Sequence, residues 1–210
     1  MPAGLRSAGG RDIRVRKRRD GNPDVSIMAL RLWCVGGEEE QMKDFLIDQI
    51  ESPIGVILIA CDGSALCALD FGEFDDRMRT LLHRRHGAFN PTSKKDPLGV
   101  STRVAAYLDG DLRALDKVKV AGGGTPFQEH VWAALRKIPP GTTTTYGALA
   151  ASLGVPTATR AVGAANGQNP NSIVVPCHRV IGADGTLTGY GGGLARKRWL
   201  LEHEGVRFPA

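Results

Sequence analysis

A run of three glycines divides this chain into two parts with different residue patterns. Ala121-Gly122-Gly123-Gly124 follows a part in which short apolar runs alternate with turn residues, and it precedes a part with mainly helical patterns. Glycine loses more backbone entropy on folding than any other residue, so three in succession indicate a linker. A chain of 210 residues can hold one large domain or two small ones, and this break favours two.

The part before the linker, residues 42–120, has the pattern of a small α/β domain. Apolar runs bounded by turn residues predict three strands, and Asp62-Gly63 is a strong hairpin signal between the second and the third. The predicted elements are strands over 45–50, 54–61 and 65–71, a helix over 74–86, and a further helix capped by Ser101. Residues 1–41 contain the basic run Arg14-Val15-Arg16-Lys17-Arg18-Arg19 and several glycines. For them we expect a disordered extension, or a chain start upstream of the functional start at Met42; the alternative is a basic arm that adds DNA affinity.

The part after the linker, residues 124–208, is predicted to be mainly helical. Thr125-Pro126-Phe127-Gln128 forms a capping box with proline at the first helical position, and Pro139-Pro140-Gly141 stops the helix that follows. Two short helices are predicted next, over about 146–153 and, capped by Thr157, over 158–166. Short helices joined by a glycine-containing turn are typical of a helix-turn-helix, a DNA-binding motif. A last helix is predicted over 194–203.

Charge and hydropathy limit the partners of the chain. Residues 124–210 hold eight Lys/Arg against four Asp/Glu, whereas residues 42–123 hold eleven against twelve. A basic C-terminal half favours a polyanionic partner. No apolar run approaches the roughly 20 residues that span a bilayer, and no secretory signal begins the chain. We therefore expect a cytoplasmic protein without a membrane partner.

The cysteines point to one reactive thiol. No two of the four form a C-x-x-C pair, so we expect reduced thiols and no zinc site; the four are Cys34, Cys61, Cys67 and Cys177. Cys177 alone has a histidine beside it, His178, and it follows the apolar run Ile173-Val174-Val175, predicted as a strand that ends at Pro176. A nearby imidazole lowers the pKa of a thiol and activates it as a nucleophile. The alternative is an inert buried thiol, because successive strand side chains point to opposite faces.

Residues 169–182 read Asn-Pro-Asn-Ser-Ile-Val-Val-Pro-Cys-His-Arg-Val-Ile-Gly. This stretch closely resembles the active-site signature of the O6-alkylguanine-DNA alkyltransferases, the self-alkylating DNA repair proteins. The resemblance is densest from Gly123 to Gly205, looser over 42–120, and does not extend to residues 1–41. It implies an α+β fold, in which a small N-terminal ribonuclease-H-like α/β domain precedes a C-terminal winged helix-turn-helix-like DNA-binding domain.

The same resemblance implies roles for single residues. Cys177 would accept the alkyl group, His178 would take the thiol proton through a water molecule, and Glu204 would orient His178. From the residues alone, Glu204 is only an acid at the unfavourable end of a helix dipole. Asn169 would order the active-site loop, and the Tyr146 hydroxyl would serve the flipped guanine; the alternative for Tyr146 is a half-buried aromatic. The substrate pocket would consist of Tyr146, Val180 and Tyr190.

The stretch 160–166 resembles the recognition helix of the family. Arg160 would fill the gap that a flipped nucleotide leaves in the duplex, although a random arginine on a helix is more often a solvated charge. The small residues Ala161 and Gly163 would allow close approach to the minor groove. Gly191 departs from relatives that carry a serine there, which predicts the loss of one hydrogen bond to guanine and a wider pocket.

The function implied is direct reversal of DNA damage by a monomer without a cofactor or metal. The protein would bind double-stranded DNA and move the alkyl group of O6-alkylguanine, with O4-methylthymine as a second candidate lesion, to Cys177 in a single turnover. Two other classes are weighed against it. An alkyltransferase-like binding protein would lack the reactive cysteine, and a Cys-His hydrolase would need an oxyanion hole for which the sequence offers no sign.

Overall fold

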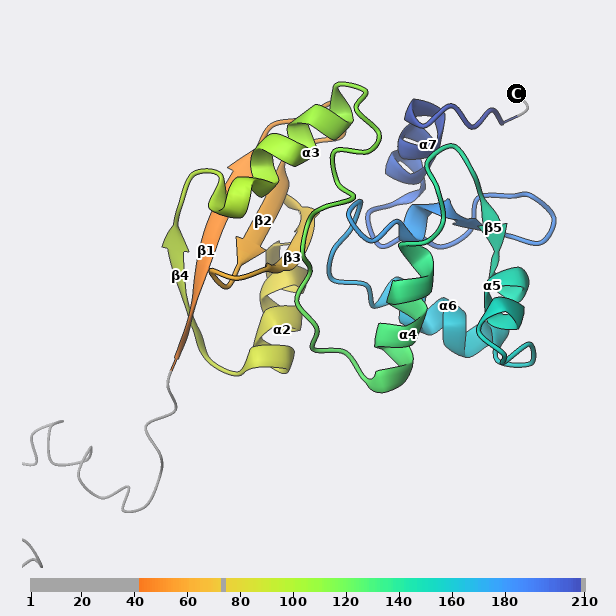
Figure 1. The fold of residues 1–210 in the computed structure, drawn as a ribbon, viewed down its shortest axis with the longest axis horizontal. Coiled ribbons are helices and arrows are strands. Elements are labelled where there is room, and N and C mark those ends of the chain that lie inside the picture. Colours follow the sequence, from red (N-terminus) through yellow and green to blue (C-terminus); the bar gives the residue numbers. More distant parts are fainter. Residues whose placement is uncertain (1–41, 73–74, 209–210) are drawn as a thin grey trace, which may run out of the picture. The chain divides into compact units, whose positions relative to one another are not determined.

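The computed structural model describes residues 42–72 and 75–208, and the extension expected over residues 1–41 lies outside these ranges. A four-stranded sheet of order β3-β2-β1-β4 forms the first part of the described chain (Figure 1). Strands β1 (Lys43–Ile50), β2 (Ile57–Cys61) and β3 (Leu66–Phe71) pair antiparallel, and β4 (Phe89–Ser93) pairs parallel with β1. The hairpin predicted at Asp62-Gly63 is present. The Asp62 carboxylate accepts the backbone N–H groups of Ser64 and Ala65, and Gly63 has a φ of +84°.

Strand β4 is missing from the sequence-based prediction because its pattern is not that of a strand. Its residues are mostly exposed and include Pro91. Proline lacks the N–H group that a central strand would donate, but β4 lies at the edge of the sheet, where that loss is tolerated.

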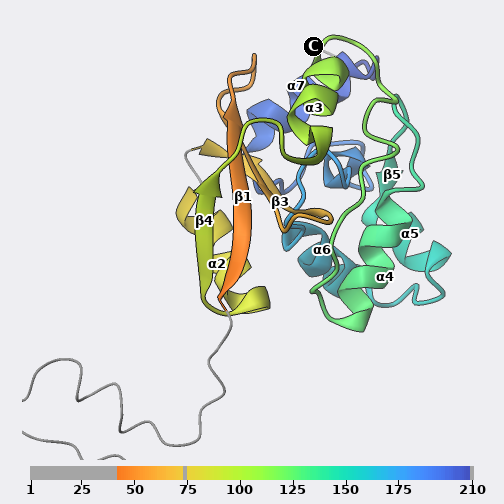
Figure 2. The same cartoon turned by 60° about the vertical axis from the view of Figure 1, so that its left-hand side comes forward.

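Helices cover both faces of this sheet (Figures 1 and 2). Alternate residues of β2 belong to two apolar clusters: Ile57, Ile59 and Cys61 pack with α3 (Val100–Leu108), and Leu58 and Ala60 with α2 (Asp75–His86). Cys61 and Cys67 are both buried in the core of this sheet.

The helix cap predicted at Ser101 is wrong. The N-cap of helix α3 is Gly99, two residues earlier, at the end of the short 3-10 helix η2 (Pro97–Gly99). The Ser101 hydroxyl instead donates a hydrogen bond to the Asp48 carboxylate, which ties the start of α3 to β1.

The second part of the chain consists of four helices and a small two-stranded sheet. The helices are α4 (Pro126–Leu135), α5 (Tyr146–Ser152), α6 (Thr159–Gly167) and α7 (Leu194–His203); β5 (Thr144–Thr145) pairs parallel with β6 (Val180–Ile181). The predicted capping box is present: Thr125 Oγ1 accepts from Gln128 N at 3.3 Å, and Gln128 Oε1 accepts from Thr125 N at 2.8 Å. The cap predicted at Thr157 is wrong, because the N-cap position of α6 is Ala158 and no side chain caps the helix there.

The strand predicted over residues 173–175 is also wrong. Ile173 has a φ of +68°, and the segment forms turns that lead into the 3-10 helix η3 (Cys177–Arg179). Its apolar character comes from burial on two sides, because Ile173 and Val174 pack with the sheet and Val175 packs with α4 and α6. Backbone hydrogen bonds from Leu69 N to Pro170 O and from Ser172 N to Leu69 O, both 2.9 Å, tie the segment to β3.

Candidate active site

The Cys177 thiol lies at the start of η3 and is almost fully buried, with 5% of its surface exposed. The Asn169 side chain, which comes just after α6, donates a hydrogen bond from Nδ2 to Cys177 Sγ at 3.1 Å. The same Nδ2 group donates to Val175 O at 2.8 Å. Asn169 therefore fixes the segment before the cysteine and places an N–H donor on the sulfur.

His178 contacts the carboxylate of Glu204. Its Nε2 atom lies 2.9 Å from Glu204 Oε1, and both side chains are fully buried. Among the described residues, no group forms a hydrogen bond with His178 Nδ1. The structure thus brings together His178 and Glu204 as the sequence predicts, and it shows no direct hydrogen bond between Cys177 and His178 within the described chain.

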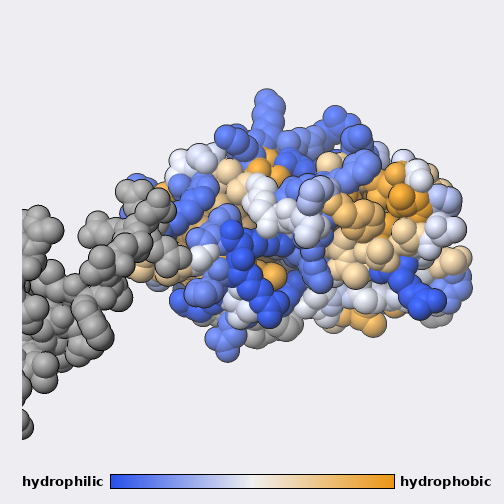
Figure 3. Space-filling view, turned by 90° about the horizontal axis from the view of Figure 1, so that it is seen from below, coloured by the Kyte–Doolittle hydropathy of each residue, from blue (hydrophilic) through white to orange (hydrophobic). Residues whose placement is uncertain are grey.

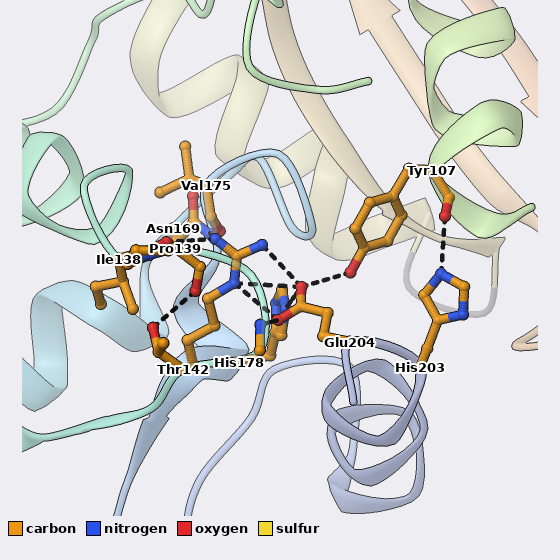
Figure 4. Close-up of polar contacts among 11 residues, drawn as sticks. Tyr107, Ile138, Pro139, Thr142, Asn169, Val175, His178, His203 and Glu204 are labelled. Carbon is orange, nitrogen blue, oxygen red and sulfur yellow. Dashed lines mark hydrogen bonds and ion pairs between the residues drawn. The ribbon is translucent and has the colours of Figure 1, made fainter. Parts of the chain in front are cut away.

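Two further side chains, which are missing from the sequence-based prediction, bind Glu204 (Figure 4). The backbone N–H of Gly141 also donates to Glu204 Oε2, at 3.3 Å. Arg179 donates from Nε to Oε2 at 2.9 Å and from Nη2 to Oε1 at 2.8 Å, and the Tyr107 hydroxyl donates to Oε1 at 2.7 Å. Arg179 also donates from Nη1 to Ile138 O at 2.5 Å. Its position directly after His178 is a signal that could have been used, whereas Tyr107 lies 97 residues from Glu204 and gives none.

The hydrogen bonds and charges of this network determine which of His178 and Glu204 carries a proton. Burial alone would raise the pKa of Glu204, but hydrogen bonds from His178 and Arg179 and the charge of Arg179 hold it well below its ordinary value. Burial lowers the pKa of His178; the hydrogen bond and the charge of Glu204 oppose this, but the charges of Arg179 and Lys197 act with burial, and the pKa stays below its ordinary value. Glu204 is therefore ionised and can only accept, so Nε2 of a neutral His178 carries the proton and Nδ1 is free to accept one.

A buried lysine that the sequence did not suggest lies near the thiol. Lys197 Nζ donates to Val180 O and Thr188 O, both at 2.6 Å. Burial lowers the pKa of Lys197 to about 8. Burial also raises the pKa of Cys177, although the Asn169 hydrogen bond and the charges of Lys197 and Arg77 oppose this. The resting thiol is therefore protonated, with groups already around it that would stabilise a thiolate.

The predicted pocket residues share one apolar cluster with the cysteine. Val180 and Cys177 are both buried members of this cluster, and Tyr146 and Tyr190 pack against it. The Tyr146 hydroxyl donates to Gly189 O at 3.4 Å, and the Tyr190 ring meets the His178 ring edge-on at 6.5 Å between centroids. The space beside Gly191 is filled, because a Cβ atom there would lie 3.0 Å from Arg77 Nη2.

Helix α6 presents a small-residue surface with a single cation. Arg160 and Ala161 are exposed, whereas a Cβ atom on Gly163 would point at the Tyr146 ring, 3.7 Å from its Cδ1 atom. Figure 3 shows the molecule from below, the side on which α6 lies in Figure 1, with apolar surface in its right-hand part.

Among the described residues, no helix is both long and apolar enough to cross a membrane.

Comparison with known protein families covers both parts of the described chain. The ribonuclease-like domain of 6-O-methylguanine DNA methyltransferase matches residues 47–121, and the DNA binding domain of the same protein matches residues 126–206. The chain belongs to the 6-O-methylguanine DNA methyltransferase family. The predicted α+β fold, with a ribonuclease-like domain followed by a DNA-binding domain, is thereby confirmed.

Relatives within this methyltransferase family are similar over nearly their whole length. A methylated-DNA–protein-cysteine methyltransferase of Salmonella typhimurium is 52% identical over 167 residues, which span 78% of this chain and 98% of the relative. The crystal structure of Mycobacterium tuberculosis OGT in complex with DNA aligns with a TM-score of 0.63 at 44% identity, covering 77% of this chain and 92% of that one. An O6-methylguanine-DNA methyltransferase from the archaeon Pyrococcus kodakaraensis gives a TM-score of 0.60 at 29% identity, covering 77% of this chain and 99% of the other.

Proposed function

We propose that this protein repairs DNA by moving the alkyl group from O6 of a guanine in duplex DNA to Sγ of Cys177, once per molecule. The observation that carries the proposal is the arrangement around one thiol: Asn169 on its sulfur, and beside it a neutral histidine oriented by an ionised glutamate. Membership of the methyltransferase family supports it, as do relatives that are methylated-DNA–protein-cysteine methyltransferases.

Activation of the thiol requires a proton acceptor that is itself held in place. His178 Nδ1 is that acceptor, because Nε2 is committed to Glu204. The proton of Cys177 reaches Nδ1 through a water molecule, since the two side chains form no direct hydrogen bond in the described structure. Glu204 stabilises the imidazolium that results, and Arg179 keeps Glu204 ionised while this happens.

The transfer step exchanges one bond for another. The thiolate attacks the alkyl carbon, the bond between that carbon and guanine O6 breaks, and the electron pair of that bond returns to the base. The Tyr146 hydroxyl donates a hydrogen bond or a proton as negative charge develops on the base. The base takes up one proton, which balances the proton that His178 accepted from Cys177, so the products are an unmodified guanine and a thioether at Cys177. No cofactor is needed because the alkyl group comes from DNA.

Two groups beside the reacting sulfur favour its anionic form. Asn169 Nδ2 donates to Sγ directly, and the Lys197 ammonium group supplies a positive charge within the same buried region. Both lower the cost of a thiolate in a site where burial raises it. Tyr190 and Val180 form the apolar surroundings of the alkyl group in this proposal.

Recognition of the duplex is proposed to occur through α6. Its exposed Arg160 enters the stack and takes the space of the flipped nucleotide, and Ala161 allows the helix to approach the groove closely. Gly163 contributes by seating Tyr146 against the helix. We assign these roles to a DNA-binding domain over residues 124–208, and we place the ribonuclease-like domain at 42–120.

Duplex DNA with a radiolabelled methyl group on guanine O6 tests this function. We expect covalent label on the wild-type protein up to one methyl group per molecule, with no further turnover. Cys177→Ser should transfer no label while still binding the duplex, and Cys67→Ser, a buried cysteine in β3, serves as the matched control. Catalytic turnover, or undiminished labelling of Cys177→Ser, would show that the assignment is wrong.

A further inference from the structure

The C-terminal end of α6 is held by side chains from two other helices. Arg77 of α2 donates from Nη2 to Gly167 O at 3.3 Å, and Arg85, two turns further along the same helix, donates from Nη2 to Gln168 O at 3.1 Å. Trp132 of α4 donates from Nε1 to Ala165 O at 2.9 Å. The last carbonyl groups of a helix lack partners within it and lie at the negative end of its dipole, so cationic donors are favourable there.

Each arginine is itself fixed in place by a second contact. Arg77 Nη1 forms an ion pair at 2.5 Å with the carboxylate of Asp70, which is 2% exposed and belongs to β3. The guanidinium of Arg77 also occupies the space that a side chain at residue 191 would need, and Gly191 provides it. Arg85 stacks over the Trp132 ring, with Cζ 4.8 Å from the ring centroid. Both guanidinium groups are thus oriented before any ligand arrives.

Helix α6 needs such support from outside. It has only nine residues, two of which are glycines, and no side chain caps its N-terminal end. A helix this short is marginal in isolation, and each interior glycine costs ~1 kcal/mol relative to alanine. Its position therefore depends on tertiary contacts, of which those from α2 come from the ribonuclease-like domain.

The segment that the arginines hold links the DNA-facing surface to the thiol. Arg160 lies near the start of α6, Gln168 caps its end, and the next residue, Asn169, donates to Cys177 Sγ. A shift at Gly167 or Gln168 would move both the proposed finger and the amide on the sulfur.

We propose that Arg77 and Arg85 are positioning residues, through which the ribonuclease-like domain holds the recognition helix ready for duplex DNA. They contact the backbone of α6 and none of the reacting atoms, although the charge of Arg77 also favours the Cys177 thiolate. Only the consequence for repair rests on the proposed function, whereas the effect on the helix does not.

Hydrogen exchange of the unliganded protein, followed by mass spectrometry, tests the positioning directly. In Arg77→Ala/Arg85→Ala, the amides in peptides covering 159–169 should exchange about tenfold faster than in the wild type. This is the smallest increase expected for the loss of hydrogen bonds to charged groups, and it applies because the Arg77 side chain is 28% exposed. Peptides of α3 should keep their wild-type rates. Arg84→Ala is the matched control, since Arg84 is exposed on the same helix and forms no bond with another described residue. Wild-type exchange of α6 in the double variant would overturn the proposal.

Single-turnover rates separate positioning from simple attraction of DNA. The measured quantity is the rate with alkylated duplex divided by the rate with free O6-benzylguanine. This ratio should fall about tenfold in Arg77→Ala/Arg85→Ala and remain unchanged in Arg84→Ala. The Arg77→Lys/Arg85→Lys variant should recover part of this loss, because lysine keeps one charged donor. An equal loss in Arg84→Ala would indicate a general charge effect and overturn the proposal. If the wild-type protein reacts with neither substrate, the proposed function fails, and the exchange rates still decide the positioning. If the double variant does not fold, the two single variants provide the same comparison.

Discussion

Removal of Arg179 should destabilise the protein far more than removal of an exposed arginine. Arg179 and Glu204 side chains are 8% and 0% exposed, and Arg179→Met would leave the Glu204 carboxylate buried without its charge partner. Breaking a buried ion pair from one side costs ~3–5 kcal/mol, and we expect a loss of this size in the free energy of unfolding. Arg198→Met is the control: Arg198 pairs with Glu202, the two side chains are 50% and 51% exposed, and the expected loss is ~0–0.5 kcal/mol.

Urea unfolding at several pH values measures this loss and its cause. In the wild-type protein the pKa of Glu204 is held below its unfolded value, so its stabilising contribution is present above that value and lost as the pH falls through the folded pKa. In Arg179→Met, burial without Arg179 should raise the folded pKa, and protonation then stabilises the variant relative to wild type as the pH falls from 7 toward 4.

A double-mutant cycle isolates the pair. Arg179→Met made in a Glu204→Gln background should cost ~2 kcal/mol less than in the wild type, because no buried charge is left uncompensated. Either of two results would show that Arg179 does not stabilise a buried Glu204 charge. The first is a loss in the free energy of unfolding no larger in Arg179→Met than in Arg198→Met, and the second is a double-mutant cycle with no coupling energy between Arg179 and Glu204.

Three further predictions concern the reaction. Glu204→Gln should slow single-turnover transfer of the benzyl group from free O6-benzylguanine to Cys177 ~10–100-fold while the affinity for lesion DNA changes less, because an amide holds and stabilises the protonated His178 poorly; equal rates at every pH would exclude the relay. Arg160→Ala should slow repair of duplex DNA more than reaction with the free base, because only the duplex requires unstacking at a cost of a few kcal/mol, and equal losses would remove the finger assignment. Lys197→Met should slow the single-turnover reaction at pH 7. The difference in rate from the wild type should narrow above pH 8, because the pKa of Lys197 is lowered to about 8 and the wild-type charge is lost there. A difference in rate that stays constant across pH 6–10 would contradict an electrostatic role.

Two local signals in the sequence predict local structure correctly in this protein, whereas the helix caps predicted at Ser101 and Thr157 are wrong. The Thr125 capping box and the Asp62-Gly63 hairpin depend on residues a few positions apart, and both are present in the structure. The run 173–175 resembles a strand because it is apolar, but its burial comes from packing between two apolar clusters, and a positive φ at Ile173 excludes a strand. Apolarity alone does not distinguish these cases.

The same limit applies to the site. The family resemblance of the motif around Cys177 implies that Asn169 orders the active-site loop, and the structure places its amide on the thiol sulfur. Tyr107, in contrast, reaches Glu204 only through the tertiary fold. Lys197 could have been predicted as buried. It is spaced three and four residues from Leu200 and Leu201 on the apolar face of α7, and Glu204 continues that spacing.

Peptide mapping by mass spectrometry, after reaction with duplex DNA containing O6-methylguanine, identifies the residue that accepts the methyl group. We expect one added methyl group, in place of the thiol proton, on the peptide that contains Cys177, and a thioether that persists after the DNA is removed. A methyl group on Cys34, Cys61 or Cys67, or an unmodified protein alongside repaired DNA, would contradict it.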